Sequence, residues 1–342
     1  MQTVLNIIIT ILVFGVLILA HEAGHFFTAL WAGVKVNEFA IGMGPAIFKK
    51  QGKKALYTIR ALPIGGFVQM DGEDGDSDDE NAFNKKPKWK RFIILITGAL
   101  MNILFGFILI CIVYSTMNLL PTTVIGSFDE NAVSNTTGLL ENDKIVKIND
   151  YNIYSYMDIS YSITKDGTVP LEVTVERDGQ KVVVPNVEFA TIEDKNLGEI
   201  YTTDFSVYGE KRNLFSVIRY SFQSTISISR SIYSFLGTLV TGHADINQVS
   251  GPIGTTSAIG QSVSIGLRPL LLIVALISIN LGIVNLLPFP ALDGGRVLLL
   301  IIEAIRKKPL SQKVEVGINA AGLILLMGLM VVIAVKDVIY LF

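Results

Sequence analysis

The sequence predicts a polytopic α-helical membrane protein: four transmembrane helices, a membrane re-entrant β-hairpin and an inserted extracytoplasmic β domain. Three observations predict this fold class. Half of the 342 residues are hydrophobic and only 17% are charged, which is too apolar for an ordinary soluble protein. Four segments are long and apolar enough to cross a bilayer, which takes about 20 residues. Between the second and third of them lies a polar stretch of short alternating runs, a pattern typical of β-strands.

The expected membrane spans are residues 4–30, 92–116, 267–288 and 316–341. They divide the chain into three parts. Residues 1–117 contain the first two transmembrane helices and a cytoplasmic re-entrant β loop, residues 118–210 form the β domain, and residues 211–342 contain an interfacial amphipathic helix and the last two transmembrane helices. The net charge of −2 gives no reason to expect nucleic acid as a partner. The expected surroundings are instead the lipid bilayer.

Charge is distributed unevenly along the chain. Residues 35–91 contain eleven lysines or arginines, and residues 306–313 contain four more. Residues 118–212 contain eight basic and sixteen acidic residues. Because cytoplasmic loops carry an excess of lysine and arginine, residues 35–91 are expected in the cytoplasm and residues 118–212 outside it.

The first span ends in an H-E-x-x-H sequence, His21-Glu22-Ala23-Gly24-His25. On a helix the two histidines lie one turn apart on the same face. They can bind one Zn²⁺, and Glu22 can take a proton from a water on the metal. Such side chains are rare inside a spanning helix unless they have a function. The motif therefore predicts a water-activating metal site within the membrane, near its cytoplasmic face.

A catalytic zinc usually has three protein ligands, so one is missing from this motif. Asp293 is the candidate, because it follows the third span directly after Pro288 and Pro290 interrupt the helix. The glycines at 294–295 are expected to loosen the backbone and present Asp293 from an unwound region. A carboxylate at membrane depth is costly and usually functional.

Two other interpretations of the acids remain open. Asp293 could pair with Arg296, or cap a helix, instead of binding a metal. Glu303 is a rival acid, although its place near the basic turn favours an interfacial ion pair. In the second span, Asn102 is expected to form a hydrogen bond between helices.

Residues 61–70 are apolar and interrupted by glycine, yet they are too short to span a membrane. We expect a strand or hairpin that re-enters the membrane near the metal, where irregular backbone requires cover from protein or a cavity. The acidic run that follows, residues 71–80, is interpreted as a solvated loop, with metal binding as the weaker alternative.

The polar stretch contains a predicted β-hairpin, in which residues 171–177 and 181–184 flank the turn Asp178-Gly179. Residues 138–149 resemble a stretch of PDZ domains, with Asn142 in place of the usual glycine. PDZ domains bind extended peptides as an added strand, so a peptide ligand is expected. The alternative is a domain that only shields the membrane part. Residues 214–240 have the composition of an interfacial amphipathic helix.

Taken together, these residues resemble the site-2 protease family of zinc intramembrane proteases, and within it the bacterial branch of the regulator-of-sigma-E protease. The resemblance covers nearly the whole chain. The shared stretches are His21–His25, Ile41–Pro45, Gly65–Met70, the PDZ-like insert, Val249–Gly254 and Asn285–Gly295. Two features differ: Ala99 stands where relatives often have proline, and there is room for one PDZ domain where many relatives have two.

The resemblance implies that His21, His25 and Asp293 ligate Zn²⁺ and that Glu22 is the general base. It also implies that Asn285 contacts the substrate, where it could donate to the developing oxyanion. The substrate is expected to pair with the strand that contains Gly65, Gly66, Phe67 and Val68. The implied function is hydrolysis of peptide bonds in the transmembrane segments of single-pass proteins, such as anti-sigma factors or remnant signal peptides, in the bacterial cell membrane.

Two functions of other classes use the same residues. A membrane metal transporter or sensor could use the same ligands without hydrolysis, but it would not need Glu22 placed as a base. A PDZ-bearing membrane scaffold could hold a structural metal at this site.

Overall fold

The computed structural model describes residues 2–73, 75, 77–166, 170–194, 198–242, 249–308 and 310–339. The chain forms two compact units, Met1–Gly106 with Ser250–Phe342, and Phe107–Val249. Helix α4 (Leu214–Val240) falls in the second unit with the β domain. The sequence grouped it with the last two transmembrane helices, and the predicted boundaries at 117 and 210 stay a prediction.

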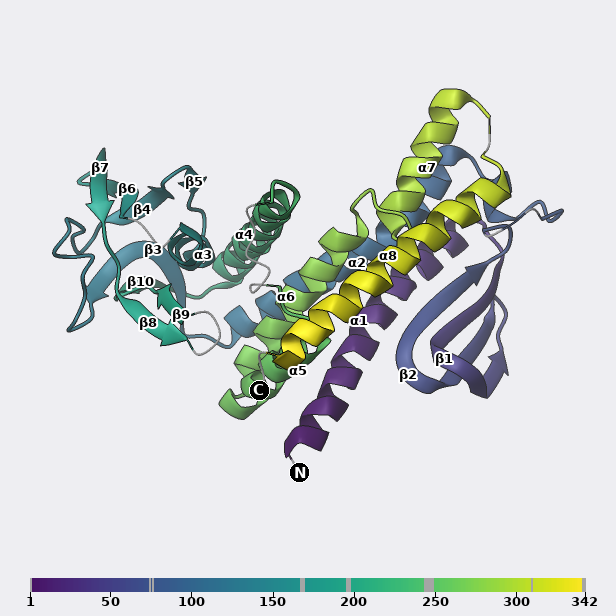
Figure 1. The fold of residues 1–342 in the computed structure, drawn as a ribbon, viewed down its shortest axis with the longest axis horizontal. Coiled ribbons are helices and arrows are strands. Elements are labelled where there is room, and N and C mark those ends of the chain that lie inside the picture. Colours follow the sequence, from purple (N-terminus) through teal and green to yellow (C-terminus); the bar gives the residue numbers. More distant parts are fainter. Residues whose placement is uncertain are drawn as a thin grey trace. The chain divides into compact units, whose positions relative to one another are not determined.

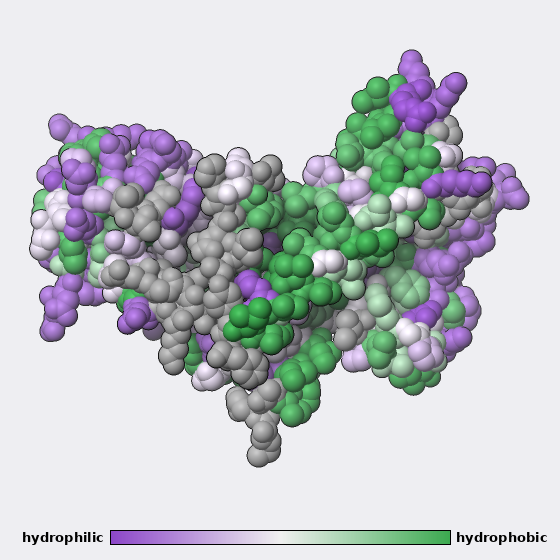
Figure 2. Space-filling model, viewed as in Figure 1, coloured by the Kyte–Doolittle hydropathy of each residue, from purple (hydrophilic) through white to green (hydrophobic). Residues whose placement is uncertain are grey.

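Among the described residues, four helices are long and apolar enough to cross a membrane. They are α1 (Gln2–Ala32), α2 (Lys88–Ser115), α6 (Leu267–Asn285) and α8 (Gln312–Ile339) (Figure 1). Each matches a predicted span. Hydrophobic residues dominate the helices of the first unit in Figure 2, whereas hydrophilic residues cover most of the β domain.

Two shorter helices of the first unit were not predicted. They are α5 (Pro252–Ile265) and α7 (Asp293–Arg306). Helix α5 begins with Pro252 at its first position, where the missing N–H of proline costs nothing. Helix α7 is too short to span a bilayer, and it begins at the residue expected to complete the metal site.

Strands β1 (Val36–Gln51) and β2 (Leu56–Met70) pair antiparallel, and both are strongly bent. The first part of β1 lies between the two ends of β2, because Phe39 is opposite Val68 on one side and Tyr57 on the other. Within β2, Gly65 bends the strand with a φ of 85°, a backbone conformation open mainly to glycine. The strand expected at Gly65–Met70 is therefore the last segment of β2. Within the described residues, only β1 pairs with it.

One hydrophobic cluster joins α1, the hairpin, α2 and α7. It includes the short 3₁₀ helix η1 (Phe83–Lys85). Its buried members include Phe26 and Ala29 of α1, Val36, Val68 and Met70 of the hairpin, Ile94 and Leu95 of α2, and Leu300 of α7. A close-packed cluster of this kind resists displacement of any one element. It therefore fixes the end of α1 that carries the histidine motif relative to the hairpin and to α7.

The β domain is built on a sheet with the order β10-β3-β4-β6-β7, and the short β5 pairs with β4. A separate pair, β8 and β9, and helix α3 complete it. Their bounds are β3 (Leu119–Phe128), β4 (Lys144–Ile148), β5 (Tyr151–Asn152), α3 (Tyr156–Asp166), β6 (Leu171–Arg177), β7 (Gln180–Val187), β8 (Thr191–Asp194), β9 (Gly198–Tyr201) and β10 (Phe205–Lys211).

The predicted hairpin of this domain is the pair β6–β7. Arg177 lies opposite Gln180, and both turn residues, Asp178 and Gly179, have positive φ. Two successive positive φ angles are what the favoured two-residue hairpin turn requires. Asn142 also has a positive φ, of 71°, which explains why asparagine can stand where glycine is usual.

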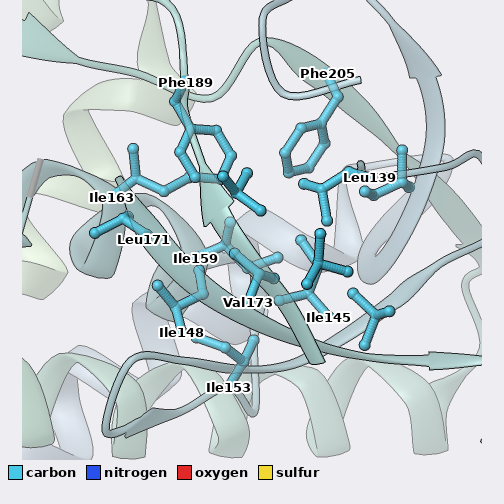
Figure 3. Packing of buried hydrophobic residues seen from close by; sticks show 14 residues of the cluster. Leu139, Ile145, Ile148, Ile153, Ile159, Ile163, Leu171, Val173, Phe189 and Phe205 are labelled. Carbon is cyan, nitrogen blue, oxygen red and sulfur yellow. The ribbon is translucent and has the colours of Figure 1, made fainter. Parts of the chain in front are cut away.

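The core of the β domain consists of aliphatic and aromatic side chains from its strands and α3 (Figure 3). Ile145, Ile159 and Val173 are fully buried in it. At its edge, Arg177 donates two hydrogen bonds of 2.7 Å to the buried carboxylate of Asp143. This pair joins β6 to the start of β4.

Helix α4 is amphipathic, and its polar face is the one that packs on the β domain. Ser227 Oγ donates to Asp158 Oδ2 at 2.7 Å, and both side chains are buried. On the opposite face Leu214, Phe215 and Phe222 are 80%, 72% and 59% exposed. The helix thus leaves a row of large apolar side chains uncovered.

Candidate metal centre

Three side chains from the two ends of the chain converge in the first unit. Nε2 of His21 lies 3.1 Å from Oδ2 of Asp293, and Nε2 of His25 lies 3.4 Å from the same oxygen. The two Nε2 atoms are 3.2 Å apart. In the part of the chain that the structure describes, this is the one group of three potential metal ligands that meet in this way.

The histidines converge because α1 remains helical through the motif, so that residues 21 and 25 project from one face. The side chain of His25 is oriented by α2, since its Nδ1 lies 2.8 Å from the backbone oxygen of Ile94. Next to it on α2, Gly98 leaves room for the imidazole. A Cβ atom there would lie 2.2 Å from Nε2 of His25.

Asp293 is the first residue of α7. A non-helical segment, the break, separates α7 from the end of α6 at Asn285. The N-terminus of a helix stabilises a carboxylate, because the helix dipole is positive there. The prediction that the next two glycines loosen the backbone is wrong. Gly294 and Gly295 are buried in the first turn of α7, where a Cβ would come within 2.2 Å of the carbonyl oxygens of Leu287 and Phe289. They permit close packing against the break.

The break itself is held by α8, which the sequence did not indicate. The backbone N–H of Ala291 donates to Oδ1 of Asn319 at 3.2 Å. Ala291 has a φ of 71°, which is unusual for a residue with a Cβ. Asn319 thus satisfies a donor that the broken helix leaves without an intrahelical partner.

Glu22 lies on the same helix between the two histidines and is half-buried. Its carboxyl group lies close to the backbone of Val68. Gly66 of the same strand is also close, since a Cβ there would lie 3.5 Å from Cγ of Glu22. The structure therefore brings Gly66 and Val68 of the last segment of β2 to the motif. Gly65 lies against Met43, and the ring of Phe67 lies under Arg60.

Asn285 is the last residue of α6, immediately before the break, and it is half-buried. The structure places it in the segment that leads to Asp293. No hydrogen bond of its side chain is defined among the described residues.

Arg296 and Glu303, the residues of the two alternative interpretations, both have partners away from the three converging side chains. Arg296 forms an ion pair with Glu73. Glu303 is buried and pairs with Arg91 at 3.3 Å, which confirms the expected ion pair. The acidic run is therefore more than a solvated loop, since Glu73 in it contacts α7. Asp74 and Asp76 of this run lie outside the described residues.

The three converging side chains fit a zinc ion. Zinc is bound by histidine nitrogen and carboxylate oxygen at about 2.0–2.2 Å in tetrahedral geometry, which separates the ligand atoms by about 3.3–3.6 Å. The observed separations of 3.1, 3.2 and 3.4 Å are close to that range. Oδ2 of Asp293 is buried without a hydrogen-bond partner, as expected of an oxygen that binds a metal.

This helical membrane fold carries an H-E-x-x-H motif with an aspartate that is distant in the sequence but adjacent in space. These features define the class of membrane-embedded zinc metalloproteases. The family model described as peptidase family M50 matches residues 9–329, and the chain belongs to that family. It is therefore a multi-pass membrane protein and an intramembrane zinc metalloprotease, and Zn²⁺ is its cofactor.

Similar proteins bear the corresponding names. A protein of Clostridium acetobutylicum named as a zinc metalloprotease is 38% identical and covers 98% of both chains. The zinc metalloprotease RasP of Bacillus licheniformis is 31% identical, with 98% of this chain and 99% of the relative covered. The regulator of sigma-W protease RasP of Bacillus subtilis is 29% identical over the same shares. The alignments with RasP extend over 421 positions, more than the 342 residues of this chain, so these relatives contain residues that this chain lacks.

Proposed function

We propose that His21, His25 and Asp293 are the zinc ligands of this protease and that Glu22 is its general base. The observation that carries the proposal is the convergence of three ligand atoms at 3.1–3.4 Å. Glu22 is the one carboxylate that the motif places beside them. Glu303, the rival acid, is already engaged with Arg91.

When bound, the zinc ion polarises the scissile carbonyl and makes water a nucleophile at neutral pH. Glu22 takes the proton of the attacking water and later gives it to the leaving amine. The backbone of Val68 lies close to the Glu22 carboxylate, so the last segment of β2 flanks the proposed base.

The substrate is held as an extended strand along the last segment of β2. A transmembrane helix must be unwound before its peptide bonds can be reached, and pairing with a strand edge satisfies the exposed backbone groups. Gly65, Gly66, Phe67 and Val68 form the binding edge. Two observations support it: β1 is the one partner of this segment within the described residues, and Gly66 and Val68 both approach Glu22.

The β1–β2 hairpin re-enters the membrane from the cytoplasm. Its bend presents large apolar side chains, with Met43, Ile47 and Leu62 more than half exposed. Such side chains are suited to a lipid environment. Asn285, at the end of α6, faces the same substrate and donates to the oxyanion.

The β domain is a PDZ-like domain outside the cytoplasm that binds a peptide segment. Helix α4 lies in the membrane interface with its apolar face toward the lipid chains. The charge distribution supports this orientation, since residues 35–91 are rich in lysine and arginine and residues 118–212 are acidic. The zinc site is then near the cytoplasmic face.

The substrates are the transmembrane segments of single-pass membrane proteins, such as anti-sigma factors or remnant signal peptides. The printed name of one relative, a regulator of sigma-W protease, supports anti-sigma factors as one class. The hydrolysed bonds lie within the membrane, as the depth of the motif in α1 suggests.

The test is cleavage of a panel of single-pass proteins by the purified enzyme and by Glu22→Gln. The expected result is cleavage within the transmembrane segment by the wild type, and loss of cleavage with retained zinc in the variant. Proteolysis that survives in Glu22→Gln contradicts the proposed base.

A further inference from the structure

Asn102 of α2 lies directly behind one of the proposed zinc ligands. Asn102 is fully buried, and its amide nitrogen lies 3.3 Å from Nδ1 of His21. Nδ1 is the ring nitrogen that faces away from the metal site, because Nε2 of His21 faces Asp293. The side chain of Asn102 therefore contacts the outer nitrogen of His21.

The chemistry of a bound metal decides which amide atom must face His21. A neutral histidine that binds a metal through Nε2 carries its hydrogen on Nδ1 and donates it to an acceptor. The amide nitrogen of asparagine is only a donor, whereas its oxygen accepts. Oδ1 of Asn102 is buried and has no hydrogen-bond partner. Rotating the amide by half a turn exchanges the two atoms within the same volume, and it places Oδ1 where Nδ1 can donate to it.

The second histidine has an equivalent partner on the same helix. Nδ1 of His25 lies 2.8 Å from the backbone oxygen of Ile94 and donates to it when Nε2 binds the metal. Residues 94, 98 and 102 are spaced four apart and so lie on one face of α2. Gly98, between them, makes room for His25. One face of α2 thus supplies an acceptor to each imidazole.

We infer that Asn102 is a positioning residue, which accepts the Nδ1–H of His21 through Oδ1 and so fixes the tautomer and orientation of that ligand. This inference rests on the proposed ligand set. It adds a function to the hydrogen bond between helices that the sequence predicted for Asn102, since its side-chain contact with His21 joins α2 to α1.

Asn102 also joins α2 to α6, through a different atom. Its backbone oxygen accepts a hydrogen bond of 2.7 Å from Oγ of Ser278 on α6, and this bond joins the two helices. Its side chain contacts His21 on α1. Substitutions at 102 and 278 can therefore separate positioning of the ligand from packing of the helices.

The experiment measures zinc affinity of the full-length protein by competition with a chelator. Asn102→Leu has the same branched shape but no acceptor, and we expect its affinity to fall about 10- to 100-fold, as for other partners of metal-bound histidines. Asn102→Asp keeps an acceptor and should bind zinc within about threefold of the wild type. Ser278→Ala, the matched control, breaks the interhelical bond and should leave zinc affinity unchanged. Asn102→Ala replaces the leucine variant if that variant does not fold.

Wild-type affinity in Asn102→Leu, or an equal loss in the leucine and aspartate variants, overturns the inference. A separate arm tests the ligand set on which it rests. His21→Ala should lose zinc more severely than any variant at 102. If His21→Ala binds zinc like the wild type, the proposed ligand set fails; if it loses zinc while Asn102→Leu does not, only the role of Asn102 fails.

Discussion

Nε2 of His21 lies 3.1 Å from Oδ2 of Asp293, although the two residues stand near opposite ends of the sequence. The contact exists because the cluster that joins α1, the hairpin, α2 and α7 sets the N-terminus of α7 against the motif. The proposed metal site needs both residues. In that proposal, the two histidines on one helical turn are two of the ligands, and the break between α6 and α7 brings the third.

The first prediction separates the two acids of α7. Asp293→Asn should weaken zinc binding by more than about 100-fold, since loss of a ligand costs more than loss of its outer partner. Glu303→Gln is the control, because Glu303 lies on the same helix as Asp293, and its substitution breaks the ion pair with Arg91 of α2 but leaves the site intact. Zinc content after dialysis measures both. An unchanged content in Asp293→Asn, or a loss in Glu303→Gln, would assign the third ligand elsewhere.

The second prediction concerns the strand edge beside Glu22. Gly66→Ala should retain zinc but lose about 10- to 100-fold in cleavage rate, because its Cβ would lie 3.0 Å from the oxygen of Ala40 and 3.5 Å from Glu22 and displace the strand. Gly15→Ala on α1 is the control, since the nearest atom to its Cβ, an oxygen of Pro63, is 3.9 Å away. Equal cleavage rates for both variants would argue against substrate binding along this edge.

The third prediction concerns metal removal and identity. A chelator should abolish cleavage of a single-pass substrate, and added Zn²⁺ should restore it, whereas Mg²⁺ should not, because imidazole ligands do not suit Mg²⁺. Cleavage is followed on gels after each addition. Zn²⁺ added to metal-free Glu22→Gln should be bound without restoring cleavage. Full activity in the presence of excess chelator, after prolonged incubation, is the outcome that this account does not allow.

The fourth prediction concerns the stability of the β domain. Asp143→Ala removes the buried partner of Arg177 and should lower the free energy of unfolding of the domain by about 3 kcal/mol. Glu176→Ala is matched to it, because it breaks an exposed cross-strand pair with Lys144 and should cost less than about 1 kcal/mol. Hydrogen exchange of the β6–β7 amides in the full-length protein measures both. Similar losses in the two variants would mean that burial of Asp143 has no energetic consequence.

The features that local pattern determines were predictable. The four spans follow from runs of apolar residues, and the β6–β7 turn follows from Asp178-Gly179. The two histidines were predictable because helical spacing alone places them on one face. Asp293 could be found because a carboxylate after a proline-broken span has few structural uses.

The remaining features depend on contacts between distant segments. Nothing local shows that Phe39 has both ends of β2 as neighbours, or that Asn319 of α8 holds the break before Asp293. Gly294 was misinterpreted because glycine permits both a loose backbone and close packing, and only the neighbouring carbonyl oxygens decide between them. The role of Asn102 needed the position of His21, although its four-residue spacing from Gly98 was visible.

The most direct test of the central claim is X-ray absorption at the zinc edge on the purified wild-type protein. The account predicts one zinc per chain, bound by two imidazole nitrogens and by oxygen at about 2.0–2.2 Å, with no sulfur. A fall of the imidazole signal from two nitrogens to one in His25→Ala would confirm the origin of the ligands. A sulfur ligand at about 2.3 Å, or an unchanged spectrum in His25→Ala, would contradict the claim that His21, His25 and Asp293 hold the catalytic zinc.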